Sequence, residues 1–457
     1  MNHHNQDEEV LQQIEREVRM RDGASKLLAA CSQREQALEA SKNLLTCNAR
    51  ILALLSQLQK MRKAQILQRV GNRPAEKIVT CTGKLAFSDL RIPLMWKDSE
   101  YFKNKGELHR CAVFCLLQCG SEIYDTDLQM VDRTLTDICF EDTIVFNDVG
   151  PEFQLRVELY SSCAAEDFFP GAAGPRRGSH SGGSAMGSFT GKKIRAVFES
   201  AAVCGSMSSG GDAGPGSASP SLCPDLSALG PKFNLLAHTT LTLSHVQERF
   251  KTHDLSLLAA EESPFWLPLY GNMCCRLVAQ PLCMLQAGIS GQLQIKLGED
   301  LSCWKNVYGI LKGKSLLCYR SEEDQEIEED PVLVIPIKKD TRICVSERAP
   351  AHLQSINIST QSQGEEVTYT LTTHTTDNTQ LWAEALWQHV YNMSQWQQCC
   401  NELMKIELRR PRKSITVKQG SLFHEIVTPS TPRDGVAVPD LSAEIRNLLS
   451  SYYKESY

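Results

Sequence analysis

Residues 38–61 (LEASKNLLTCNARILALLSQLQKM) carry two rows of large apolar side chains on one segment with helical periodicity. The first row, with a spacing of seven residues, is Leu38, Leu45 and Leu52. The second row, with the same spacing, is Leu44, Ile51 and Leu58. A coiled-coil seam needs one such row, because a repeat of 3.5 residues keeps a single stripe on the partner helix. The segment therefore predicts a helix that packs on a neighbour with one row and leaves the other row for a further surface.

A second helix is predicted upstream of this segment. Between Glu8 and Gln68 there is no proline, and Gly23 is the only glycine. Apolar residues recur at helical spacing in the first half, as at Leu11, Ile14 and Val18. The polar segment 32–35 (SQRE) can cap helix ends, so the chain is expected to reverse there. We predict an antiparallel helical hairpin over residues 6–70, which is either a coiled-coil oligomerisation domain or a module that offers a broad face to a protein partner.

Several blocks of sequence resemble a known family. Residues 17–31 (EVRMRDGASKLLAAC) and 43–50 (NLLTCNAR) are similar to the Rho-binding hairpin of the rhotekins, which is an HR1/REM-like element. Further blocks that resemble the same family follow in order over roughly residues 7 to 410: 88–98 (SDLRIPLMWKD), 131–138 (VDRTLTDI), 236–243 (LAHTTLTL) and 266–271 (WLPLYG). The resemblance implies a multidomain, non-catalytic effector that links a Rho-family GTPase to the cytoskeleton or to a membrane.

The resemblance and the helix positions together suggest polar residues at the rim of a GTPase interface: Arg19, Lys26, Lys42, Asn48 and Arg50. Lys42 fits a solvated surface charge equally well, and Leu28 and Leu45 are expected in the hairpin core. The hairpin should prefer the GTP-bound form, in which the switch loops are ordered. The resemblance implies that it slows GTP hydrolysis by occluding the switch region, and it brings no obvious arginine finger that would speed the reaction. The alternative is an anillin-like, lipid-directed cortical scaffold whose hairpin mainly oligomerises.

Beyond Pro74 the pattern changes to short strand-like runs: residues 77–80, 84–87, 112–117, 143–146, 153–160 and 233–237. Residues 164–230 interrupt them with Gly, Ser, Ala and Pro, a composition that predicts a disordered insertion. We therefore expect one β-sandwich over residues 76–283, which resembles the C2-like anillin-homology region. Only Asp125 and Asp127 are closely spaced aspartates, and this ligand count favours a calcium-free fold.

A third pattern covers residues 287–397, where several strands precede one amphipathic helix. Residues 377–380 (DNTQ) are expected to cap this helix, and Trp382 matches the helix tryptophan of pleckstrin-homology domains, which implies a β-barrel closed by the helix. Lys296 and Lys305 fit the start of a phosphoinositide-binding pattern, but Val307 stands where arginine is usual and residues 321–330 are acidic. Lipid binding is therefore expected to be weak. Residues 411–457 are Pro/Ser/Thr-rich and are expected to be a mostly disordered tail.

Composition narrows the function classes. The formal net charge of −6 disfavours nucleic-acid binding, and no apolar run approaches the length of a membrane span. The polar, acidic first residues fit no secretory signal, so a cytoplasmic location is expected, with the cell cortex, a membrane surface and the nucleus left open.

No chemistry-bearing motif points to an enzyme, a metal site or a cofactor. Eighteen cysteines are present without a C-x-x-C motif, and Cys111, Cys115 and Cys119 alternate with apolar residues, as core cysteines do. Residues 309–315 (GILKGKS) resemble a phosphate-binding loop, but three residues separate the glycines where four are required. This segment is predicted to be a hairpin turn. We expect function by binding, without a catalytic residue.

Overall fold

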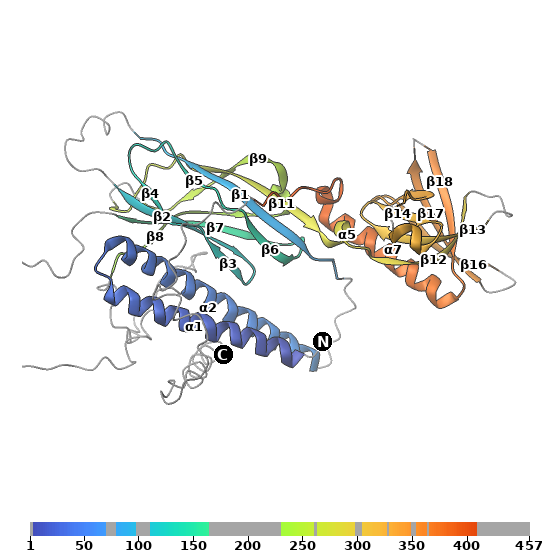
Figure 1. The fold of residues 1–457 in the computed structure, drawn as a ribbon, viewed down its shortest axis with the longest axis horizontal. Helices are drawn as coiled ribbons and strands as arrows, with labels where there is room; N and C mark the ends of the chain where they lie inside the picture. The colour runs from blue at the N-terminus through green and yellow to red at the C-terminus, as the bar shows by residue number, and fades with distance from the viewer. Residues whose placement is uncertain are drawn as a thin grey trace, which may run out of the picture.

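The computed structural model describes residues 3–69, 79–96, 110–163, 230–259, 263–297, 304–326, 329–348, 353–362 and 365–408. The expected insertion over 164–230, apart from Gly230, and the expected tail over 411–457 lie outside these residues. The described chain has a helical hairpin, a sandwich of two antiparallel sheets, and a C-terminal sheet with one long helix (Figure 1).

The hairpin consists of α1 (His3–Ala30) and α2 (Arg34–Arg69), which run antiparallel. Residues 31–33 connect them, close to the predicted reversal. Polar side chains at this point and the absence of proline from both helices explain why one long helical stretch divides only here. The helical N-terminus predicted from periodicity is confirmed.

Two sheets form the sandwich. The first pairs in the order β5-β1-β11-β9, with β6 also on β1, and the second in the order β10-β8-β7-β2-β3, with β4 also on β2. The strands of the first sheet are β1 (Gly83–Pro93), β5 (Asp137–Phe140), β6 (Ile144–Val149), β9 (Gln247–Asp254) and β11 (Asn272–Pro281). The strands of the second are β2 (Cys111–Cys119), β3 (Glu122–Asp125), β4 (Gln129–Val131), β7 (Leu155–Cys163), β8 (Asn234–Leu241) and β10 (Ser256–Leu257). A short 3-10 turn, η4 (Leu243–His245), precedes β9.

Most strand-like runs of the sequence are strands in the structure. Residues 84–87 lie in β1, residues 112–117 in β2 and residues 233–237 overlap β8. The run at 77–80 is the exception: Val79 and Thr80 form no strand, and residues 77–78 lie outside the described chain. Val79 is 80% exposed, so no partner strand buries it and the local β-propensity has no sheet to join.

The C-terminal sheet has seven strands in the order β15-β14-β13-β12-β18-β17-β16. Its strands are β12 (Ile289–Leu297), β13 (Lys305–Lys312), β14 (Ser315–Tyr319), β15 (Leu333–Pro336), β16 (Arg342–Arg348), β17 (Leu353–Ser362) and β18 (Glu365–Thr372). A short helix, α6 (Glu322–Glu326), lies between β14 and β15. Within the described residues the pairing stays open at β15 and β16, so the expected closed barrel is not observed.

Helix α7 (Thr376–Trp396) packs on this sheet with Trp382, Leu386 and Met393 buried, as predicted. The predicted capping box at 377–380 is wrong by two residues. Thr375 is the N-cap, and its hydroxyl accepts a hydrogen bond from the Asn378 amide at 3.3 Å. Both segments contain N-cap residue types three positions before a polar residue, so local sequence did not separate the two registers.

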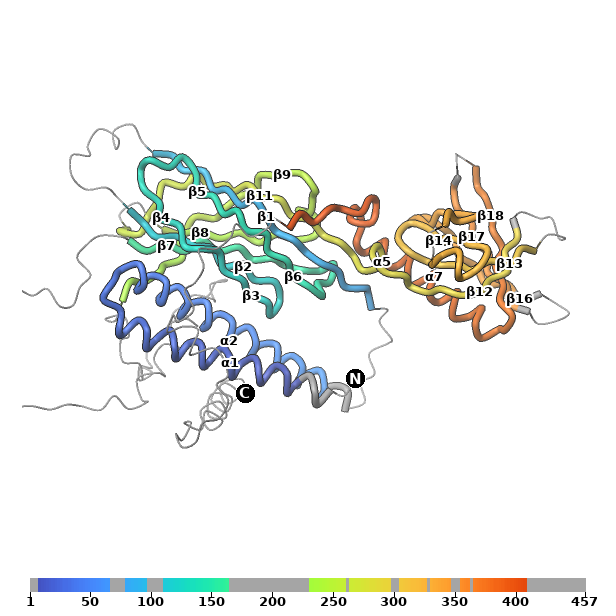
Figure 2. The backbone as a smooth tube through the Cα atoms, viewed as in Figure 1, coloured from blue at the N-terminus to red at the C-terminus, as the bar shows by residue number. Residues whose placement is uncertain are grey.

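The sandwich continues directly into the C-terminal sheet. β11 leads through α5 (Leu282–Leu285) into β12, and α7 ends in a 3-10 turn, η5 (Gln397–Cys400). The chain then returns along the first sheet of the sandwich, where Gln280 donates a hydrogen bond to the Met404 carbonyl (Figure 2). One continuous cluster of buried apolar residues spans both parts.

Candidate functional site

The second helix of the hairpin uses its two apolar rows on two different surfaces. One row faces α1 in a cluster of seven buried residues: Val10, Ile14, Val18, Ile51, Leu54, Leu55 and Leu58. Their spacing of three, four and seven residues places them on one face of each helix. This half of the prediction is confirmed for Ile51 and Leu58 of the second row, whereas Leu44 lies outside the cluster.

The other row of α2 packs on the second sheet of the sandwich. Leu38 and Ala53 join a buried cluster with β2, β3 and the start of β8, and Leu45 and Ala49 pack at its edge. The cluster members from the sandwich side are Ala112, Phe114, Leu116, Ile123 and Phe233. The expectation that this row is left for an outside partner, with Leu45 in the hairpin core, is therefore corrected. The sandwich covers Leu38 and Leu45 of this row, whereas Leu52 is half-buried and lies outside the cluster.

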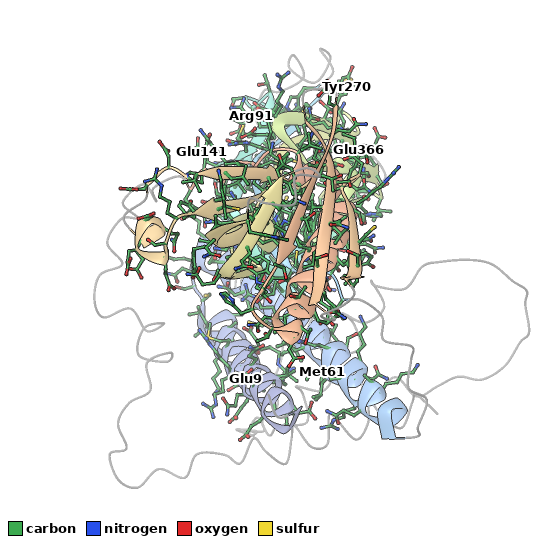
Figure 3. The ribbon with its side chains drawn as sticks, turned by 90° about the vertical axis from the view of Figure 1, so that its right-hand side faces the viewer. Glu9, Met61, Arg91, Glu141, Tyr270 and Glu366 are labelled. Carbon is green, nitrogen blue, oxygen red and sulfur yellow. The ribbon has the colours of Figure 1, made fainter. Side chains whose placement is uncertain are left out.

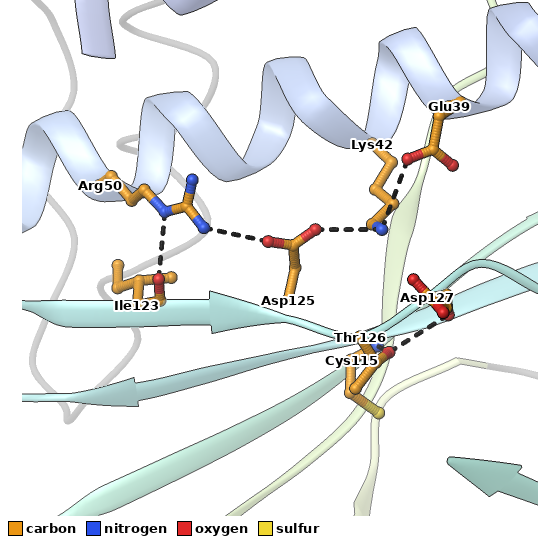
Figure 4. Close-up of polar contacts among 8 residues, drawn as sticks. All are labelled: Glu39, Lys42, Arg50, Cys115, Ile123, Asp125, Thr126 and Asp127. Carbon is orange, nitrogen blue, oxygen red and sulfur yellow. Dashed lines mark hydrogen bonds and ion pairs between the residues drawn. The ribbon is translucent and has the colours of Figure 1, made fainter. Parts of the chain in front are cut away.

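A carboxylate on the sandwich fixes this contact by pairing with two cations of α2. Asp125, the last residue of β3, lies 3.0 Å from Lys42 Nζ and 3.0 Å from an Arg50 guanidinium nitrogen (Figure 4). Arg50 also donates a hydrogen bond from Nε to the Ile123 carbonyl at 3.1 Å. Lys42 and Arg50 are eight residues apart, which is about two helical turns and brings both onto one face of α2. These pairings of Asp125 with Lys42 and Arg50 are called the clamp below.

Burial separates the five residues suggested for a GTPase interface into two groups. Lys42 is 4% exposed and Asn48 is 6% exposed, and Arg50 is half-buried against Asp125. Arg19 and Lys26, on α1, are exposed and pair with Glu15 and with Asp22 one helical turn away. Exposed pairs of this kind contribute little to stability. Of the five, Arg19 and Lys26 are the ones accessible to a partner of the closed hairpin and sandwich.

The hairpin carries polar groups between its apolar layer and the clamp. Arg50 lies 3.9 Å from Glu17 of α1, so a chain of charges runs from Asp125 through α2 to α1. Cys47 is buried beside Glu17, and burial, with a smaller contribution from the carboxylate, raises the pKa of its thiol to about 12. Cys47 is therefore a neutral core thiol rather than a nucleophile.

The two lysines suggested for weak lipid binding differ in access. Lys296 on β12 is 3% exposed, whereas Lys305 at the start of β13 is exposed. Ile295 and Lys305 are register partners, so the two lysines lie at neighbouring positions of adjacent strands. The structure therefore leaves one of the two ammonium groups open to a headgroup.

The remaining motifs of the sequence have structural roles. The segment at 309–315 is the β13–β14 hairpin, with Gly313 at φ +60° in its turn, as predicted. Cys111, Cys115 and Cys119 lie in the buried core, and desolvation of Cys111 raises its pKa to about 12. No group of His, Cys, Asp and Glu side chains that could hold a metal ion occurs among the described residues. No helix in this part of the chain has the length and apolar character of a membrane span.

Comparison with known proteins shows the family to which this chain belongs. A family model described as "Cell division protein anillin" matches residues 81–247. Human Rhotekin is 48% identical over 443 residues, which cover 94% of this chain and 76% of that protein. Human Rhotekin-2 is 41% identical over 92% of this chain and 68% of that protein. The chain belongs to the rhotekin family.

Solved structures show a much weaker likeness. A structure of the two tandem C2 domains of Extended-Synaptotagmin 2 matches 66% of this chain and 93% of that chain, with 9% sequence identity and a TM-score of 0.21. Both sheets of the sandwich in this rhotekin-family chain are antiparallel throughout.

The role of Asp125 in the clamp could not be predicted from local sequence, because its pairing with Lys42 and Arg50 joins residues 75 or more positions apart. From the sequence, Asp125 is weighed only as a calcium ligand. One signal was present. Residues 112–117 form an unbroken apolar run, and such a run is typical of a strand that is buried on both faces. A second cover for β2, beyond the opposite sheet, could have been inferred from it.

Proposed function

We propose that this chain is a non-catalytic effector that binds the GTP-loaded form of a Rho-family GTPase through its N-terminal hairpin. Membership of the rhotekin family supports a Rho-effector role. The observation that carries the proposal is the extent of the match, since 94% coverage of the chain must include most of the hairpin at residues 3–69. The hairpin is accordingly proposed to be HR1/REM-like, the sandwich C2-like and the C-terminal sheet and helix a pleckstrin-homology domain.

Preference for one nucleotide state follows from the behaviour of small GTPases. Their switch loops are ordered by the γ-phosphate, so a rigid helical surface shaped to them binds one state. Such a surface slows GTP hydrolysis when it occludes the switch region without supplying an arginine finger. Arg19 and Lys26 are the exposed members of the suggested interface, and we assign them to its rim.

The experiment uses the whole chain with Rho loaded with GDP or with a non-hydrolysable GTP analogue. We expect binding of the GTP form to exceed that of the GDP form by at least about tenfold, which is ~1.4 kcal/mol. The double variant Arg19→Glu/Lys26→Glu should lose most of this binding. A matched control, Lys60→Glu/Lys63→Glu, makes the same charge change at exposed positions near the far end of α2 and should keep it. Equal binding of both nucleotide forms contradicts the proposal.

Single-turnover hydrolysis of GTP by Rho tests the second part of the function. An excess of the chain should slow hydrolysis, and acceleration would show that the chain acts as an activating protein instead. Coupling of the GTPase to the cytoskeleton or to anionic membranes at the cell cortex belongs to the same proposal, with Lys305 as the accessible lysine for weak headgroup binding.

The second candidate is an anillin-like cortical scaffold whose hairpin mainly oligomerises. The match of residues 81–247 to the anillin model favours it. The cover of the sandwich over the first row of α2 disfavours the oligomerising role, and among hairpin residues 7–65 no large apolar side chain is exposed. Sedimentation of the whole chain distinguishes the two candidates, because only the scaffold hypothesis expects hairpin-dependent oligomers.

A further inference from the structure

Strand β2 is buried on both of its faces. Cys111, Val113, Cys115 and Leu117 point into the sandwich core, and the alternate residues belong to the cluster that contacts α2. Ala112 and Phe114 have no exposed surface, and Leu116 has 3%. Phe114 also stacks on Tyr160 and meets the edge of Phe233. The outer side of this sheet is therefore a second apolar core rather than a solvated surface.

The hairpin covers this outer side as a third layer. Figure 1 shows α2 lying along β3 with α1 farther from the sheet, and Figure 3 shows Glu9 and Met61 on the hairpin, away from Tyr270 and Arg91 of the sandwich. Polar contacts with the sandwich side continue in the N-terminal part of α2. Arg34 donates to the Cys163 carbonyl at 2.9 Å, and Ser41 donates to the Pro231 carbonyl. The contact therefore follows much of α2 and is not confined to one patch.

Asp125 lies at the centre of this contact. Both of its carboxylate oxygens have a cationic partner, and the Lys42 ammonium also lies 5.8 Å from the centroid of the Phe114 ring. Separation of the hairpin would expose the apolar residues around Phe114 and would remove every one of these pairings at once. A partner that displaced the sandwich from α2 would have to replace both kinds of contact.

We propose that Asp125 anchors the helical hairpin as a permanent third layer of the sandwich, and that a GTPase binds the outward side of the hairpin while this clamp stays closed. The identity of that partner rests on the proposed function. Lys42 and Arg50 are then positioning residues that hold the hairpin, and they do not touch the GTPase. The hairpin and the sandwich act as one binding unit with a fixed relative orientation.

A zero-length cross-link reports directly on the clamp. A carbodiimide activates the Asp125 carboxyl, the Lys42 amine displaces the urea, and an amide joins the two residues that now lie 3.0 Å apart. Peptide mapping of the whole chain should find this cross-link. Lys42→Arg is the matched control, since it keeps the positive charge but forms no such amide. Absence of the Lys42–Asp125 cross-link in the wild-type chain would overturn the anchor.

The GTPase is then added at saturation in its GTP-analogue form. The yield of the cross-link should change by less than about twofold, and the cross-linked chain should bind the GTPase with its affinity kept within about threefold. Loss of the cross-link on GTPase binding, or loss of binding on cross-linking, would show that the sandwich and the GTPase compete for α2. Both outcomes overturn the proposal.

Substitution of the anchor provides an arm that needs no GTPase. Asp125→Asn should speed amide hydrogen exchange over residues 38–53 by at least about tenfold, because the helix loses the docking that stabilises it. Asp127→Asn, two residues farther along and exposed, should leave exchange unchanged, and Asp125→Glu should restore most of the protection. Equal exchange in the Asn variants would refute the anchor. If the wild-type chain binds no GTPase, the proposed function fails, and this arm still decides the anchor.

Discussion

The sandwich is attached to its two neighbours in different ways. The hairpin is held to a sheet face by apolar residues of α2, by the pairings of Asp125 with Lys42 and Arg50, and by hydrogen bonds from α2 side chains to backbone carbonyls. The C-terminal sheet is held at a sheet end by the continuous path β11–α5–β12 and by a shared core. A face contact of this kind can be removed without breaking the sheet beneath it, whereas the end contact has no boundary at which the core divides.

The largest expected effect on stability is at Trp396, in the contact between the sandwich and the C-terminal sheet, which is called the joint below. Its side chain has no exposed surface, and its indole nitrogen donates to the Cys81 carbonyl at 3.0 Å, at the start of the sandwich. Trp396→Ala should lower the free energy of unfolding by about 3–5 kcal/mol, as for other buried aromatic residues. Chemical denaturation followed by hydrogen exchange should show both parts losing protection together. Independent unfolding of the two parts would mean that the joint is weaker than the shared core indicates.

Leu38 tests the face contact with a smaller expected effect. Leu38 is 1% exposed between α2 and the sandwich, and Leu38→Ala should lower the free energy of unfolding by about 2–4 kcal/mol. Hydrogen exchange should report faster opening of the hairpin, with the first sheet of the sandwich retaining its protection. Leu52→Ala, at a half-buried position outside both clusters of the hairpin, is the control and should have a lesser effect. Equal effects of the two would contradict the third-layer arrangement.

Local sequence was sufficient for both helices of the hairpin and for β2, but not for the docking of α2 on the sheet. The seven-residue spacing identified both rows of α2, and the apolar run at 112–117 identified β2. Each of these apolar surfaces needs a partner that buries it, and the local sequence does not indicate that α2 and β2 pack on each other. The pairing of Asp125 with α2 depends on where the chain returns after the hairpin, and such long-range placement leaves no periodic trace.

In the C-terminal part, the local sequence again did not predict how the strands pair and pack. Strand β16 has only a weak local signal, because it alternates apolar residues with Arg342, Cys344 and Ser346 at a sheet edge. The closed barrel was expected from family resemblance and not from strand pairing, and the described pairing is open. The burial of Lys296 could not be found from the sequence, because the packing of β12 in the folded sheet produces it.

Arg50 and Arg19 lie on the two helices of the hairpin and differ in burial. Arg50 is half-buried and bonds both Asp125 and the Ile123 carbonyl, whereas Arg19 is exposed beside Glu15. Arg50→Gln should lower the free energy of unfolding by about 1–2 kcal/mol, because it removes charge-assisted hydrogen bonds. Arg19→Gln should change it by less than about 0.5 kcal/mol, as for other exposed pairs. Urea denaturation of both variants tests this order. A larger effect of Arg19→Gln would show that the contact of Arg19 on α1 contributes more to stability than the contacts of Arg50.

The smallest expected effect is the dependence of stability on pH that comes from His389 in the C-terminal part. His389 of α7 is 3% exposed and donates a hydrogen bond of 2.7 Å from Nε2 to the Gly313 carbonyl, and its burial lowers the pKa of the imidazole below the usual 6.5. In the unfolded chain this group takes up a proton near pH 6.5, while the folded chain keeps it neutral to lower pH. The unfolded state therefore binds more protons in that window, so stability is complete above about pH 6.5 and falls as the pH drops below it.

The melting temperature of the whole chain should accordingly be lower at about pH 5.5 than at about pH 7.5. His389→Gln keeps a donor for the Gly313 carbonyl but cannot be protonated, so it should reduce this difference. His253 in the sandwich also has a pKa lowered by burial and by His245 and Lys251, so part of the difference should remain. His374→Gln, at an exposed position before α7, is the matched control and should leave the difference unchanged. If His389→Gln behaves like this control, the buried imidazole does not contribute to the pH response of the joint.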